Sequence, residues 1–243
     1  MSLPPIEDML AKVQKFERNA VLVTSADEVQ DEMHVPEAWI EMLRRQSAGT
    51  KSWVEPWKPF QDLLPEVYDF LQHKVRGVCL LLKDQQPPCL LYVYSRGEKN
   101  YFFRGWPPLG DQMPQGKEKI WACLLPGLQQ FYRELHNGWT HLSSNSMGPL
   151  PVNDIGYLSD QDWELEPDEE ARLPFRLSDV LTVFANGGGD LLGLDLTHGV
   201  SASESHALAW WHEEPLAPDL NMNFWGLMGG WIGGQLEHVD IAQ

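Results

Sequence analysis

The sequence predicts an α+β protein in which helices pack against a twisted, mostly antiparallel sheet. Two kinds of pattern carry this prediction. Apolar residues recur every three or four positions in several stretches, as they do along one face of an amphipathic helix. Other stretches are short β-branched and aromatic runs bounded by turn-like residues, as strands are. With 43% apolar residues and 11 tryptophans among its 243 residues, the chain can build a large core.

The first part of the chain is predicted to be helical. Apolar residues at helical spacing indicate a helix over residues 6–17, and Pro36 opens a second helical stretch, "EAWIEMLRRQ". A third helix lies within "FQDLLPEVYDFLQHK". Pro65 limits where that helix can begin, because a helix interior does not tolerate proline.

From Val75 onward the pattern becomes that of strands. Three short apolar runs separated by turn-like residues predict an antiparallel meander: "VRGVCLLLKD", "CLLYVYS" and "NYFFRGW". A helix follows in "LLPGLQQFYRELHNGW", where Asn137 and Gly138 form a typical C-terminal stop. Three more strands are predicted in "DVLTVFA", "DLLGLDL" and "SHALAWWHE". Phe224 to Leu236 then form a closing helix.

This change of pattern predicts the domain organisation. Residues 1–75 form a helical N-terminal extension, and residues 76–243 form an α+β domain. The extension either stands apart or forms one compact unit with the rest of the chain.

Three consecutive glycines separate two of the predicted strands. A dinucleotide-binding fingerprint needs glycine at the sixth position, where Leu192 stands, and a helix after it. A P-loop needs a lysine, and none occurs after Lys119. Glycine adopts positive φ at little cost, so the sequence instead predicts a tight turn that brings "GLDL" back beside "LTVFA". The turn residues are Gly187, Gly188, Gly189 and Asp190.

The negative charge is concentrated in the second half of the chain. Residues 1–133 contain 16 Lys and Arg against 17 Asp and Glu, a net charge of −1, whereas residues 134–243 contain 2 against 18, a net charge of −16. Residues 154–170, the acidic segment, carry eight acids and no base. Such a field repels nucleic acid and attracts a basic protein. The alternative is that the acidic surface only keeps the protein soluble.

No pattern indicates catalysis or a cofactor. His212 stands beside Glu213 and Glu214, but adjacent strand residues point to opposite faces of a sheet, and the chain has neither H-E-x-x-H nor G-x-S-x-G. The three cysteines form no C-x-x-C pair. We therefore expect no enzyme, no metal and no cofactor. The first ten residues do not resemble a signal peptide and no stretch resembles a membrane span, so we expect a cytoplasmic protein without a membrane partner.

The second half of the chain resembles the SUKH superfamily over about residues 120–240. The matching pieces stand in the family's order: "LPGLQQFYRELHNGW", "FANGGGDLLGLDL", "ALAWWHEEP" and "FWGLMGGWI". Bacterial members of that superfamily are largely immunity proteins that neutralise polymorphic toxins. The resemblance implies a SUKH-like α+β domain that acts as a binding scaffold, with no catalytic residues to carry over. Residues 1–75 have no counterpart in it.

Together the resemblance and the charge predict an immunity protein that neutralises its cognate toxin by stoichiometric binding. The expected partner is a basic toxin domain, such as a nuclease, because an acidic surface accelerates its association. Trp210 and Trp211 point to opposite faces of a strand, so one is expected in the core, and Trp211 is expected to anchor the interface. The candidate partner-binding residues are Asp154, Asp160, Asp162, Glu164, Glu166, Asp168, Glu169, Glu170, Trp211, Glu213 and Glu214.

Two other functions stay open at this point. The chain could be a metal-dependent hydrolase or transferase, in which Asp190, Asp195 and Glu204 converge on a metal ion. It could also be a regulatory adaptor that recognises a cellular protein with the same surface.

Overall fold

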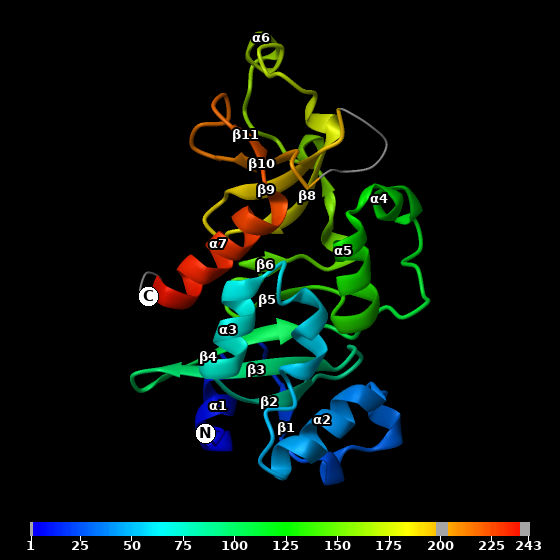
Figure 1. The fold of residues 1–243 in the computed structure, drawn as a ribbon, viewed down its shortest axis with the longest axis vertical. Helices are drawn as coiled ribbons and strands as arrows, with labels where there is room; N and C mark the ends of the chain where they lie inside the picture. The colour runs from blue at the N-terminus through cyan, green and yellow to red at the C-terminus, as the bar shows by residue number, and fades with distance from the viewer. Residues whose placement is uncertain (1, 198–203, 239–243) are drawn as a thin grey trace.

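Two antiparallel sheets lie one after the other along the long axis of the molecule (Figure 1). The structure is a computed structural model, and it describes residues 2–197 and 204–238. The α+β prediction is confirmed. The expected strands, however, are divided between two sheets rather than gathered in one.

Sheet A has the strand order β1-β2-β3-β4-β5. Its strands are β1 (Val21–Val23), β2 (Val75–Leu82), β3 (Cys89–Arg96), β4 (Lys99–Gly105) and β5 (Trp139–His141). The predicted meander forms its centre, β2 to β4. Both faces of this sheet are covered, which explains why its strands read as nearly continuous apolar runs. In β2, Val78 and Leu80 face the main core, whereas Cys79 and Leu81 face a smaller cluster beneath helix α1 (Ile6–Val13).

Sheet B has the order β11-β10-β9-β8-β6, and the short strand β7 pairs with β8. Its strands are β6 (Gly148–Pro149), β7 (Gly156–Tyr157), β8 (Val180–Ala185), β9 (Leu191–Asp195), β10 (Ala207–Trp210) and β11 (Asp219–Met222). Strands β8 and β9 pair antiparallel on either side of the glycines, as the sequence predicts.

The helices cover the sheets and connect them. The α-helices after α1 are α2 (Glu37–Ser47), α3 (Pro65–His73), α4 (Glu118–Cys123), α5 (Pro126–Gln130), α6 (Pro167–Glu170) and α7 (Phe224–His238). Helix α5 continues into a π-helical turn, η4 (Phe131–Leu135). Six 3-10 turns complete the described elements: η1 (Ala26–Glu28), η2 (Asp31–Met33), η3 (Glu55–Phe60), η5 (Val152–Asp154), η6 (Leu158–Asp160) and η7 (Leu177–Asp179). Helix α7 runs from sheet B to α3, and the two helices are in contact (Figure 1).

One hydrophobic core runs through both sheets. It includes Tyr92 and Phe103 of sheet A, Phe184 of sheet B, and Met228 of α7, all fully buried. Residues 1–75 supply β1 to sheet A, and α2 and α3 contribute to this core. The division of the chain at residue 75 stays a prediction.

A chain of hydrogen bonds crosses the middle of this core. Trp57 Nε1 donates to Tyr92 Oη (3.0 Å), which lies 2.8 Å from His136 Nε2, and His136 Nδ1 lies 3.2 Å from the carbonyl oxygen of Trp106. A carbonyl only accepts, so Nδ1 carries the proton and donates to it, while Nε2 accepts from the Tyr92 hydroxyl. The neutral imidazole therefore satisfies every member of the chain.

Two buried histidines are held neutral by this packing. Burial lowers the pKa of His136 to about 3, although its hydrogen bond to the Trp106 carbonyl acts in the opposite direction. Burial and the nearby charge of Lys12 lower the pKa of His141 to about 4. In the unfolded chain both side chains take up a proton near pH 6.5.

We predict that the protein loses stability in mild acid. Below pH 6.5 both histidines are protonated in the unfolded chain but stay neutral in the folded chain. The free energy of unfolding should therefore fall by up to about 1.4 kcal/mol per pH unit for each histidine as the pH is lowered. Urea unfolding between about pH 7 and about pH 5 measures this slope. His141→Gln should make the slope shallower, because it removes one of the two buried imidazoles. A flat wild-type profile would contradict the prediction.

Candidate partner-binding surface

The outer face of sheet B, which points away from α7, is covered by the acidic segment and the stretch that follows it. The sheet contributes Val180, Leu191, Leu208 and Trp210 to a separate hydrophobic cluster. The covering side chains are Leu158, Trp163, Leu165, Leu173, Phe175 and Leu177. Apolar residues between the acids thus hold the acidic segment against the sheet, and its carboxylates face the solvent.

Trp163 is the central contact of this cover. Its ring lies 5.1 Å from that of the fully buried Trp210 in an edge-to-face arrangement. Its Nε1 donates a hydrogen bond to the carbonyl oxygen of Leu158 at 2.8 Å. The ring therefore contacts the sheet while the indole nitrogen fixes the local backbone.

The acids themselves close short turns in the backbone. Asp160 Oδ2 accepts from the backbone N–H of Tyr157 (2.7 Å), and Asp162 Oδ1 accepts from that of Glu164 (3.0 Å). Glu169 Oε2 accepts from the N–H of Glu166 (3.1 Å), at the start of α6. Each such bond satisfies a free backbone donor and restricts the carboxylate that accepts it.

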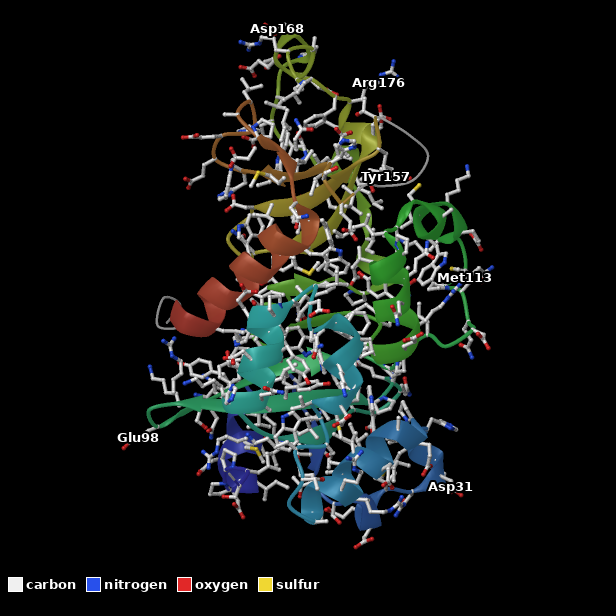
Figure 2. All side chains as sticks on the ribbon, viewed as in Figure 1. Asp31, Glu98, Met113, Tyr157, Asp168 and Arg176 are labelled. Atoms are coloured by element: carbon white, nitrogen blue, oxygen red, sulfur yellow. The ribbon has the colours of Figure 1, made fainter. Side chains whose placement is uncertain are left out.

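These carboxylates are scarcely neutralised by the chain. Seven of the eight acids are exposed, and Glu169 is half-buried. Arg172 approaches Glu169 at 3.4 Å, but it is itself exposed, so this pair contributes little. Asp168 lies at the tip of the molecule, at the opposite end from Asp31 (Figure 2). The negative charge is therefore gathered at the sheet B end.

The remaining candidates are Trp211, on the other side of the strand from Trp210, and two acids just after it. Trp210 points to the outer face, whereas the half-buried Trp211 contacts Trp231 of α7, with ring centroids 5.8 Å apart. Glu213 and Glu214 are exposed in the turn that follows. The predicted residues therefore form two groups, the acidic segment on one face and the Trp211 group on the other.

The glycine turn is a hydrogen-bonded joint. Asn186 Oδ1 accepts from the backbone N–H groups of Gly188 (2.8 Å) and Asp190 (3.0 Å), and its Nδ2 donates to Asp190 Oδ2 (2.7 Å). Asp190 Oδ1 accepts from the backbone N–H (3.1 Å) and from Nδ1 (2.8 Å) of His212. The turn is thereby tied to the end of β10.

The electrostatics of Asp190 follow from these contacts. Burial acts to raise the pKa of its carboxyl, but hydrogen bonds from His212 and Asn186 outweigh burial and hold the pKa below its ordinary value. The sequence suggests that His212 could meet Asp190 or Asp195 but does not decide between them, because the pairing depends on where β10 ends beside β9. The pairing of Trp211 with Asp219 (3.2 Å) was missed because "DLNM" does not look like a strand.

The acids named for a metal site do not converge. Asp190 and Asp195 lie at opposite ends of β9, about 16 Å apart along an extended strand. Glu204 uses Oε1 to accept a hydrogen bond from Trp225 Nε1 (3.0 Å). Within residues 2–197 and 204–238, no group of three metal-binding side chains is found, and no helix is long and apolar enough to cross a membrane.

No protein-family model matches this chain, and neither a curated protein nor a solved structure matches it. The pieces quoted for the SUKH resemblance lie on α5, on β8 and β9 with their turn, on β10 and on α7. The family assignment stays a prediction.

The turn predicts different effects at neighbouring glycines. Gly189 has a φ of 111°, and a Cβ there would lie 2.6 Å from Cγ of His212, so Gly189→Ala should destabilise the protein by about 1–3 kcal/mol. Gly188 has no positive φ, and its Cβ would meet nothing closer than 3.5 Å. Gly188→Ala is therefore the matched control and should leave the free energy of unfolding almost unchanged.

Urea unfolding of both variants measures the difference. Equal stabilities for the two variants would show that the turn does not require glycine at position 189.

Proposed function

We propose that the protein neutralises a basic protein partner, a toxin domain, by stoichiometric binding at the sheet B end. The observation that supports this most is the acidic segment, whose carboxylates are exposed but are carried on an ordered, packed piece of chain. A binding surface that is ordered beforehand loses little conformational entropy on association.

The charge distribution favours a basic partner. Residues 134–243 carry a net charge of −16, and the neutral remainder of the protein adds no opposing field. Long-range attraction of this kind raises the association rate by steering the encounter. It also repels nucleic acid, so a nuclease toxin would be recognised through its own basic surface rather than through its substrate.

The resemblance to SUKH immunity proteins supports the toxin as the particular partner. An immunity protein acts by occupying its toxin, and needs no chemistry of its own. A chemical role has one observation in its favour, the 2.8 Å contact of Asp190 with His212. The structure of the turn also explains this contact, because the Asp190 carboxylate accepts hydrogen bonds from Asn186 Nδ2 and from the backbone N–H of His212, just after β10.

We predict that the acidic segment controls the association rate. The test variant combines Asp160→Asn, Asp162→Asn, Glu164→Gln and Glu166→Gln, since amides can still accept the hydrogen bonds that close the local turns. We expect a toxin domain to be encoded in a neighbouring reading frame, and that purified domain is the partner used in the test. At low salt the variant should associate more slowly than wild type while its release rate stays similar.

The matched control neutralises four exposed acids on η1, η2 and α2, around Asp31, which lies at the opposite end of the molecule (Figure 2): Asp27→Asn, Asp31→Asn, Glu32→Gln and Glu37→Gln. It changes the net charge equally, and should slow association less. The difference should vanish toward 1 M salt, where the Debye length is about 3 Å instead of about 8 Å. Failure to bind the toxin, or equal rates for the two variants at every salt concentration, would overturn the proposal.

A second prediction separates binding from chemistry. Asp190→Asn and His212→Ala should leave toxin neutralisation in cells intact wherever the variant is folded, because the binding surface does not need a proton donor or acceptor at these positions. Neutralisation, thermal unfolding and toxin binding are measured together. A folded variant that binds the toxin but no longer protects the cell would establish a chemical role.

A further inference from the structure

On the α7 side of sheet B, three aromatic rings form a row from the core to the surface. Phe184 of β8 is fully buried, and its ring lies 5.5 Å from that of Trp231. Trp231 in turn lies 5.8 Å from Trp211, and both tryptophans are half-buried. The buried end fixes the outer rings, so their exposed parts form a rigid apolar surface, the tryptophan pair.

One carboxylate contacts this pair, and two more acids follow Trp211 in the sequence. Asp219 Oδ2 accepts a hydrogen bond from Trp211 Nε1 at 3.2 Å, which places a negative charge at the edge of the ring. Glu213 and Glu214 follow Trp211 closely, and the Glu213 side chain is 85% exposed. No Lys or Arg occurs in the sequence after Arg176, and the basic side chain that approaches Glu213 is that of His212, whose Nε2 lies 3.9 Å from Glu213 Oε1.

Elsewhere in the protein, two tryptophans bind an arginine side chain on their ring face. There the half-buried Trp106 has the guanidinium of Arg104 over its ring, 4.3 Å from the centroid, and Trp121 has Arg133 at 5.0 Å. Among the described residues, no cation of the chain stacks in this way on Trp211 or Trp231.

We infer that the tryptophan pair binds an arginine of the basic partner. A guanidinium stacks flat on an indole ring and also pairs with a carboxylate at its edge, whereas an ammonium is a strongly hydrated point charge. Trp211 and Trp231 supply the ring faces, and Asp219 and Glu213 supply the carboxylates. Leu216 and Leu220, which are 42% and 37% exposed, add apolar surface in the same segment of chain.

This inference rests on the proposed function and divides recognition between two surfaces. The acidic segment attracts the partner over a long range, which sets the association rate. The tryptophan pair makes a close, desolvated contact, which sets the lifetime of the complex.

The test uses two defined probes, deca-arginine and deca-lysine, at low ionic strength. The indole N–H resonances of Trp211 and Trp231 are assigned with Trp211→Phe and Trp231→Phe and followed by NMR during titration. Deca-arginine should shift both resonances, and deca-lysine should shift them much less at equal saturation. The shifts themselves are read on the wild-type protein, and the two Phe variants serve only to assign the resonances.

Variants then measure the contact. Trp211→Leu should weaken deca-arginine binding about five-fold and deca-lysine binding less than about two-fold. Asp219→Asn keeps an acceptor for Trp211 Nε1 but removes the charge, so it should weaken deca-arginine binding while the indole resonance stays in place.

Two results would overturn the inference, and they have different meanings. If both peptides bind equally and shift only residues 154–170, the tryptophan pair is not a binding surface, while the proposed function stands. If neither peptide binds at low salt, recognition of a basic partner fails altogether, and the proposed function fails with it.

Discussion

The outer face of sheet B is apolar and must be buried, and the proposed recognition surface follows from how the chain covers that face. Val180, Leu208 and Trp210 present an apolar face that α7 does not reach, because α7 lies on the opposite side. The acidic segment covers that face with Trp163 and its apolar neighbours. Burial of these side chains leaves the intervening carboxylates in water, so the same packing that stabilises the sheet displays the charge.

Sheet B therefore has two different faces, and we propose that both contact the partner. On the outer face, charge dominates, and the carboxylates are held by short backbone turns. On the α7 face, aromatic surface dominates, and Trp211 is held by Asp219 and Trp231. Asp190 and His212 join the glycine turn to the end of β10, beside Trp211. In our account, the outer face provides long-range attraction and the α7 face provides close contact. Both surfaces are attached to β10, through Trp210 and through Trp211 at the end of that strand.

Local patterns predicted the elements well, and long-range pairing could not be predicted from them. The glycine turn and its two strands follow from residues that are neighbours in sequence. The division into two sheets does not, because β2 to β4 are buried on both faces and their apolar runs carry no alternation that assigns a face. The sequence does not predict that the acidic segment packs on the sheet, because Trp163 and Leu165, which make that contact, stand isolated among charged residues. The separation of Trp211 from the acidic segment depends on the direction of β10 and on α7.

The central claim is that the acidic segment is ordered before any partner arrives. Backbone ¹⁵N relaxation of the free protein tests this most directly, by comparing residues 155–170 with the strands of sheet B. The account predicts order parameters near those of the strands, about 0.85, and a clear fall in the Trp163→Ala variant. Order parameters below about 0.6 in the wild-type protein would mean that the carboxylates are carried on a flexible loop, and would contradict the account.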